Sequence, residues 1–156
     1  MDMDNTRELV KTVSLVLPSG ALGVINTVAI IYLASDGTGI VKDSKAIELA
    51  KQMGYSKSTW GYYVKKLREF GVLDKRWDNY VLPKKYIEQF ERFLKVVEIG
   101  DYCKARDEIR KLWEEADNPY TVALVVVAIN YLGLKDLGTK ENEMRLEVFA
   151  HAYKFT

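Results

Sequence analysis

The segment "YTVALVVVAINYL", residues 120–132, restricts the fold most, because it has almost no polar face. A helix that is apolar around its whole circumference has to be enclosed, either by other parts of its own chain or by a second chain. The run is shorter than the ~20 residues that a membrane-spanning helix needs, and it contains Asn130. We therefore expect a buried core helix over residues 119–132 and no membrane association.

The rest of the chain also predicts mainly helices. The run "ALGVINTVAIIYLA" is likewise too short for a membrane span, so it is expected to form a core helix over residues 21–34. Apolar residues at spacings of three and four predict a short helix over residues 5–17, which Pro18 ends. Further helices are expected over residues 84–97, 101–116 and 140–153.

Between the first core helix and Pro83 the pattern changes. "SDGTG" breaks the helix, and "IVKD" has the composition of a short strand. Ser44 and Ser56 are the expected N-caps of two further helices, each of which ends at a glycine. "VLDKR" and "NYVL" then predict two strands of a hairpin, with a tight turn at Trp77-Asp78-Asn79.

This order of elements, with the segment "ELAKQMGYSKSTWGYYVKKLREFGVL", resembles the winged helix-turn-helix family over roughly 60 of the 156 residues. The residues that match the family's second helix, turn, third helix and exit into the first wing strand are Leu49, Ala50, Met53, Gly54, Tyr55, Trp60, Val64, Leu67, Gly71, Val72 and Leu73. Two features depart from the family: Trp60 is bulkier than the usual aliphatic residue, and the wing is short. The resemblance implies a winged-helix domain over residues 19–83.

The resemblance also implies which residues would meet a nucleic acid, because the family's third helix enters the major groove. If Trp60, Val64 and Leu67 face the core, the opposite side of that helix faces outward. Lysines there would neutralise phosphates, while Ser58 and Tyr62 would contact base edges or phosphates. The nucleic-acid-binding residues expected in the helix and the wing are Lys57, Ser58, Gly61, Tyr62, Lys65, Lys66, Lys75 and Arg76.

The charge distribution supports a partner for this part of the chain. The net charge of the whole chain is only +1. Residues 19–86, however, hold 11 lysines and arginines against 6 aspartates and glutamates, a net charge of +5. Residues 87–156 hold 10 against 13, a net charge of −3. Such an asymmetry indicates that residues 19–86 have a polyanionic partner and that the acidic residues 87–156 do not contact it.

No pattern of residues predicts catalysis. His151 is the only histidine and Cys103 the only cysteine, so neither a zinc site nor an internal disulfide is predicted. Neither a phosphate-binding loop nor a nucleophile elbow is present. We therefore expect no enzymatic activity, no metal and no cofactor. The single cysteine and an acidic N-terminus without a signal-peptide pattern favour a cytoplasmic location.

Two functions stay open at this point. The favoured one is binding of double-stranded DNA through the winged helix, most simply as a transcriptional regulator. The alternative is a non-catalytic subunit whose winged helix and acidic helices hold other proteins together in a larger assembly, including a nucleoprotein assembly. Salt-sensitive DNA binding by the isolated protein separates the two.

The organisation expected for the chain is an N-terminal helix over residues 1–18, the winged-helix domain over 19–83 and a C-terminal helical bundle over 84–156. The bundle is also expected to make a homodimer. Its helix over residues 119–132 is apolar all round, and the last predicted helix adds further apolar side chains, namely Leu146, Phe149, Tyr153 and Phe155. A twofold dimer would bury this surface and present two recognition helices to one duplex.

Overall fold

The computed structural model describes residues 19–136, and it confirms that the protein is mainly helical with one small antiparallel sheet. The elements are α2 (Ser19–Ala34), β1 (Ile40–Lys42), α3 (Asp43–Gln52), α4 (Lys57–Glu69), β2 (Asp74–Arg76), β3 (Asn79–Val81), α5 (Lys84–Ile99), α6 (Tyr102–Glu114) and α7 (Pro119–Asp136). The helices predicted over residues 5–17 and 140–153 lie outside the described residues, as do the side chains of Leu146, Phe149, Tyr153 and Phe155.

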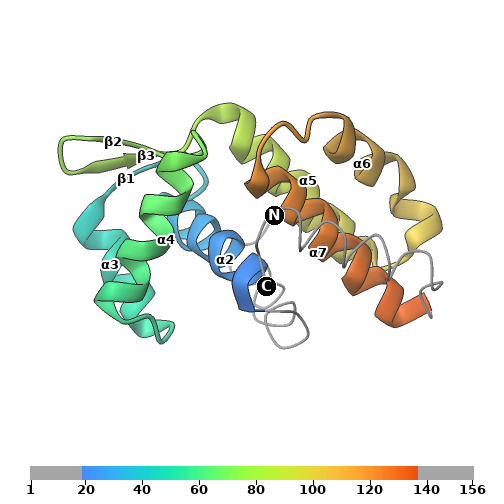
Figure 1. Cartoon of the computed structure of the whole chain (residues 1–156), viewed down its shortest axis with the longest axis horizontal. Helices are drawn as coiled ribbons and strands as arrows, with labels where there is room; N and C mark the ends of the chain where they lie inside the picture. The colour runs from blue at the N-terminus through green and yellow to red at the C-terminus, as the bar shows by residue number, and fades with distance from the viewer. Residues whose placement is uncertain (1–18, 137–156) are drawn as a thin grey trace.

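Helix α2 lies between two groups of elements (Figure 1). The sheet, α3 and α4 lie on one side of it, and α5, α6 and α7 lie on the other. Apolar residues of α2, among them Val28 and Ile31, belong to a single buried cluster that also includes residues of α4 and of α7, for example Leu67 and Leu124. A division into domains at residues 83–84 stays a prediction.

Helix α7 is enclosed by the chain itself. It packs against α2, α5 and α6, and Val122, Leu124, Val125 and Val127 are all buried. Val126, on the same helix, is half-buried. Of the two ways in which so apolar a helix can be covered, burial within one chain accounts for most of its described surface.

The N-cap predicted for α3 is wrong. The helix begins at Asp43, directly after β1, and Lys42 occupies the cap position in place of Ser44. The backbone N–H of Asp43 donates to the carbonyl of Asp78 in the hairpin turn, at 2.7 Å. A contact with a segment far along the chain therefore sets the start of this helix. The carboxylate of Asp43 also lies where a helix N-terminus favours negative charge.

The N-cap predicted for α4 is confirmed. The Ser56 hydroxyl accepts a hydrogen bond from the backbone N–H of Thr59, so it satisfies one of the donors that a helix N-terminus leaves free. At the other end Gly71 adopts a left-handed conformation with a φ of 77°, which glycine tolerates without a steric penalty.

The hairpin is shorter than predicted. Val72 and Leu73 were expected in its first strand, but their N–H groups both donate to the carbonyl of Leu67 and finish the end of α4 instead. Strand β2 therefore starts at Asp74, and the turn consists of Trp77 and Asp78 alone. The sheet has the order β1-β3-β2, and every pair of neighbours is antiparallel.

Candidate nucleic-acid interface

Helix α4 has one buried face and one exposed face, as the apolar spacing predicts. Trp60, Val64 and Leu67 are buried in the core, so the inner stripe of the helix is confirmed. Tyr55, in the turn before α4, packs edge to face against Trp60 with ring centroids 6.0 Å apart. Burial raises the pKa of the Tyr55 hydroxyl above its ordinary value. These contacts fix which side of α4 faces solvent.

The outer face of α4 carries the residues that the sequence placed there. Exposed side chains or backbone are found at Lys57, Ser58, Gly61, Tyr62 and Lys65. Lys66 is half-buried, and its ammonium lies 5.6 Å from the centroid of the Tyr62 ring. The Ser58 hydroxyl lies 3.3 Å from that of Ser56, so it is partly engaged at the start of the helix.

Gly61 is not required by the packing of this chain. A Cβ atom added there would meet no atom within 4 Å apart from its chain neighbours and the backbone of its own helix, and the residue is exposed in the middle of α4. Glycine inside a helix is less stable than alanine by roughly 0.5–1 kcal/mol. Gly23 in α2 is the opposite case, because a Cβ there would overlap the ring of Tyr63 of α4. Gly23 allows two helices of the protein to approach, whereas Gly61 leaves space for something outside it.

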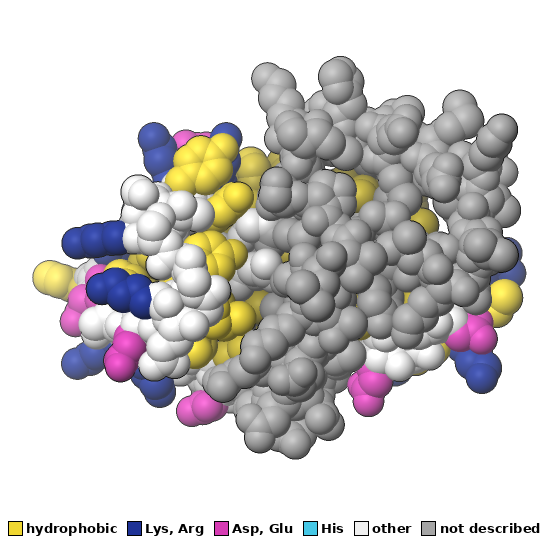
Figure 2. Space-filling model, turned by 90° about the horizontal axis from the view of Figure 1, so that it is seen from below, with side chains coloured by type: hydrophobic (Ala, Val, Ile, Leu, Met, Phe, Trp, Pro, Cys, Tyr) yellow, Lys and Arg dark blue, Asp and Glu magenta, His cyan; other side chains and the backbone are white. Residues whose placement is uncertain are grey.

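The surface around α4 is basic and unpaired. Residues 44–70 contain six lysines and arginines against two glutamates. Within the part of the chain that the structure describes, none of these eight side chains forms an ion pair. The far end of the molecule differs, since Arg92 of α5 bonds both Glu108 and Glu115. Figure 2 shows the Lys and Arg side chains gathered mostly at the end that carries α3, α4 and the sheet, with a few acidic ones among them.

The two cations predicted for the wing are exposed but paired. The Lys75 ammonium lies 3.4 Å from the carboxylate of Asp43 and 5.8 Å from the centroid of the Tyr80 ring. The Arg76 guanidinium lies 3.1 Å from the carboxylate of Asp74. Lys75 therefore ties β2 to the start of α3, and a phosphate would have to compete with a carboxylate for either side chain.

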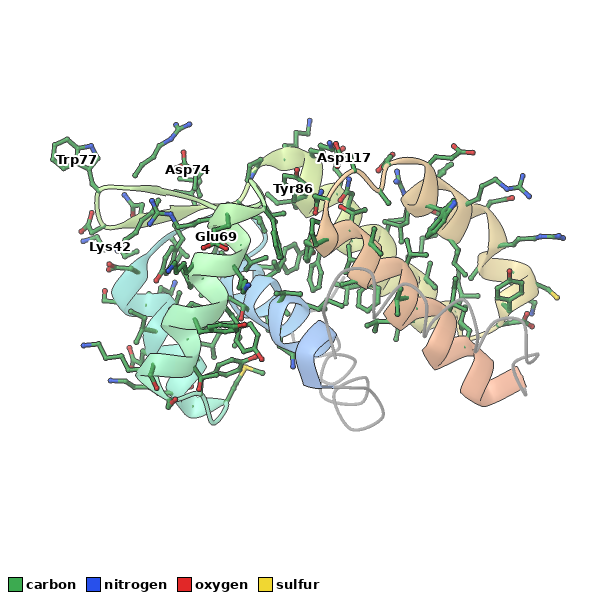
Figure 3. The ribbon with its side chains drawn as sticks, in the orientation of Figure 1. Lys42, Glu69, Asp74, Trp77, Tyr86 and Asp117 are labelled. Atoms are coloured by element: carbon green, nitrogen blue, oxygen red, sulfur yellow. The ribbon has the colours of Figure 1, made fainter. Side chains whose placement is uncertain are left out.

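Trp77, at the tip of the hairpin, was not among the predicted site residues. Its side chain is 95% exposed, and Figure 3 shows it pointing away from the body of the molecule. Its φ of 59° lies in the left-handed region, which a bulky residue rarely adopts. The signal was present in the sequence: a large aromatic residue stands in a two-residue hairpin turn, where glycine and asparagine are the usual choices.

Among residues 19–136, no group of His, Cys, Asp and Glu side chains could hold a metal ion. Nor does that part of the chain contain a helix that is long and apolar enough to cross a membrane. The described surface thus offers a basic helix face and an exposed tryptophan as its most unusual features.

Comparison with known proteins shows the family of this chain. It is 34% identical over 137 residues to a protein of Sulfolobus spindle-shape virus 1 described as "Uncharacterized protein E-178". The match covers 88% of this chain and 71% of that protein, and the chain belongs to the E-178 family. No protein-family model matches the chain, and no solved structure matches it.

Proposed function

We propose that this protein is a winged-helix protein that binds double-stranded DNA through the outer face of α4, most simply as a transcriptional regulator. The order of elements from α2 to β3 supports the winged-helix class. The sheet order β1-β3-β2 supports it too, because it carries the β2–β3 hairpin beyond the helices as a wing. The E-178 relative adds the family and no function.

In this proposal α4 lies in the major groove, which is about 12 Å wide and admits a helix. Lys57, Lys65 and Lys66 neutralise phosphates, which contributes affinity without sequence preference. Ser58 and Tyr62 lie on the same exposed face and offer hydroxyls to base edges or phosphates. Because Lys66 rests on the Tyr62 ring, these two side chains are already partly ordered before DNA binds.

The observation that carries the proposal is Gly61 in its basic surroundings. An exposed glycine in mid-helix destabilises the helix, and the packing of this chain gives nothing in return. This lower helix stability is explained if another molecule has to approach the backbone of α4 closely at Gly61. Lys57 and Lys65, four positions before and after Gly61, are exposed cations without an ion pair among the described residues, so a polyanion is the partner that fits this face.

The test is a binding measurement by fluorescence anisotropy on random-sequence duplex DNA at two salt concentrations. We expect binding that weakens steeply as salt rises, since each neutralised phosphate releases about 0.9 counterion. The double variant Lys65→Ala/Lys66→Ala should bind less tightly with a shallower slope. Lys104→Ala is the control, because Lys104 is an exposed lysine on α6, in the opposite part of the molecule. A wild-type protein that does not bind would favour the alternative, a non-catalytic subunit that holds other proteins together.

A homodimer is part of the proposal, because it would present two copies of α4 to one duplex. The described residues of α7 are mostly buried within one chain, so this helix alone needs no partner. The prediction now depends on the apolar side chains beyond residue 136. Light scattering on the full chain at micromolar concentration should give the mass of a dimer, and the mass of a monomer would reject it.

A further inference from the structure

The tip of the β2–β3 hairpin combines two unfavourable features in one residue. The indole of Trp77 is 95% exposed, more than any other large apolar side chain whose burial the structure describes. Its backbone has a φ of 59°, a left-handed conformation in which the β-carbon lies too close to the carbonyl oxygen. Glycine and asparagine adopt this conformation more readily than tryptophan does. Neither feature helps the folded chain, because the ring is almost entirely in solvent. A residue held in this way points to a role outside the fold.

Next to Trp77 the outer face of the sheet carries a row of hydrogen-bond donors. Lys42 of β1 and Arg76 of β2 lie opposite Asn79 of β3, one on each side of it. The alternation of exposed and buried residues along β1 puts Lys42 on the solvent face, with the buried Val41 on the other. Asn79 is the residue after the turn, so this row lies directly beside Trp77.

The charges in the row are only partly neutralised. Arg76 bonds Asp74, yet its side chain remains 71% exposed. Lys42 is exposed and has no ion pair among the described residues. The acidic group on the turn itself is Asp78, which is exposed beside the ring. The tip is thus one aromatic ring with two cations and the Asp74 carboxylate on the sheet side, and the Asp78 carboxylate on the turn.

This arrangement fits a nucleobase better than a protein. A protein interface needs a contiguous apolar patch with a buried centre. The neighbours of Trp77 in the turn and in the adjoining row of the sheet are charged or polar, and the exposed Ile40 lies one row further along the same face. A nucleobase offers one flat face for the indole, and the phosphates on either side of it match Lys42 and Arg76. The chemistry that would be recognised is a base face together with its phosphodiester backbone.

We propose that Trp77 stacks on a nucleobase of the bound nucleic acid while Lys42 and Arg76 contact the adjacent phosphates. The inference rests on the proposed function, and it adds a second contact outside α4. The base has two possible sources: an unpaired nucleotide, or a base step of an intact duplex that the indole pries apart.

Trp77→Ala is the first variant, measured on an intact duplex, on the same duplex with one unpaired base, and on a single strand. We expect affinity to fall roughly 5- to 140-fold on at least one of the three, the range that loss of base–aromatic stacking produces. Trp77→Phe, which can still stack, should keep more affinity than Trp77→Ala. A loss confined to DNA with unpaired bases assigns the base to an unpaired nucleotide, and a loss on the intact duplex assigns it to an opened base step.

The second readout is tryptophan fluorescence in a Trp113→Phe background. Trp60 is buried, so a change in the solvent-exposed emission on adding DNA reports Trp77. We expect quenching on binding, and Lys42→Ala should raise the DNA concentration needed for half of it. Asp78→Asn, which removes the carboxylate beside the ring, should lower that concentration.

A loss of affinity can be separated from a loss of folding, because the Trp77 ring is 95% exposed and alanine would have to adopt the same left-handed backbone conformation. The melting temperature of Trp77→Ala should therefore stay close to that of the wild type. Equal affinity of Trp77→Ala and the wild type on all three DNAs, with no quenching, would overturn the stacking contact. If the Lys65→Ala/Lys66→Ala variant still lost binding in that case, the proposed function would stand. If the wild type bound none of the three DNAs, both proposals would fall together.

Discussion

The indole N–H of Trp60 donates a hydrogen bond to the hydroxyl oxygen of Tyr80 at 3.1 Å, and the two rings meet edge to face with their centroids 6.1 Å apart. Both side chains are buried. Trp60 belongs to α4 and Tyr80 to β3, so this contact fixes the basic helix relative to the hairpin that carries Trp77. A substitution of either residue should lower the stability of the fold, and it should affect DNA binding only because the fold is less stable.

Tyr80→Phe removes the acceptor of this bond and leaves the Trp60 N–H unpaired in the core. We expect the free energy of unfolding to fall by about 1–3 kcal/mol. Trp60→Ala should lower it by ~3–5 kcal/mol, because a large core side chain is lost as well. Urea denaturation followed by circular dichroism measures both. Tyr62→Phe is the control, since Tyr62 is exposed, and its effect should stay within about 0.5 kcal/mol. A Trp60→Ala variant with unchanged stability would show that the inner face of α4 is misassigned.

Gly23 of α2 and Gly61 of α4 should respond in opposite ways to substitution by alanine. Gly61→Ala should raise the free energy of unfolding by roughly 0.5–1 kcal/mol and still weaken DNA binding, because its methyl group projects toward the partner. Gly23→Ala should lower the free energy of unfolding by about 1–3 kcal/mol, because its methyl group overlaps the Tyr63 ring. Tyr63 has little room to move, since it packs on Tyr55 and Tyr62.

Thermal or urea unfolding of both variants, with anisotropy on one duplex, measures these effects. The decisive result is whether Gly61→Ala raises the free energy of unfolding while it weakens DNA binding. A Gly61→Ala variant that is more stable and binds as tightly as the wild type would mean that nothing approaches α4 closely at that point.

Local pattern predicted the features of the site that depend on local spacing. The stripe of Trp60, Val64 and Leu67 follows from helical periodicity, and Ser56 as the cap of α4 follows from its own hydroxyl. Ser44 was misassigned because the start of α3 depends on a bond between Asp43 and Asp78, which lie 35 positions apart in the chain. No local rule contains that contact.

The ion pairs also divide into those that local sequence could predict and those that depend on the tertiary structure. The sequence showed that Lys75 and Arg76 are cations on a hairpin, but their partners decide how available they are. Asp74 is two positions from Arg76 on the same strand face, so that pair could have been anticipated. Asp43 reaches Lys75 only because β1 and β2 flank the same strand. The enclosure of α7 by α2 likewise needed the tertiary structure, since the sequence allowed burial by either one chain or two.

The ion pair between Lys85 and Asp117 predicts a limit on stability in acid. The Lys85 ammonium lies 3.0 Å from the Asp117 carboxylate and joins α5 to the segment before α7. Their hydrogen bond lowers the pKa of Asp117 below its usual 3.8 and raises the pKa of Lys85 above its usual 10.5. The pKa of Asp117 is lower in the folded state than in the unfolded state. The ion pair therefore stabilises the fold above pH 3.8 and loses this effect as the pH falls below that value. For Lys85 the effect is present below pH 10.5 and is lost as the pH rises beyond it.

Asp117→Asn should therefore lower the free energy of unfolding at neutral pH, by at most about 1 kcal/mol because the pair is exposed. The difference from the wild type should shrink once the pH drops below 3.8. Urea titrations at several pH values measure it. Asp107→Asn removes one charge from an exposed residue of α6 that has no ion pair within residues 19–136, and its effect should not follow that pH dependence. A difference for Asp117→Asn that stays constant as the pH falls well below 3.8 would contradict the role of the ion pair.

Affinity and sequence preference should separate on the outer face of α4. Lys65→Ala and Lys66→Ala should each weaken binding to all duplexes alike and reduce the salt slope by about 1, because each removes one phosphate contact. Lys66→Ala should also release the Tyr62 ring that it covers. Tyr62→Ala should change the ranking of sequences with little change in slope, since its contact is with base edges and carries no charge. The ranking comes from selection on a random duplex library with wild type and variant in parallel, and the slopes come from anisotropy at several salt concentrations. Lysine variants that left both affinity and slope unchanged would show that this helix does not lie on DNA, whatever Tyr62→Ala did.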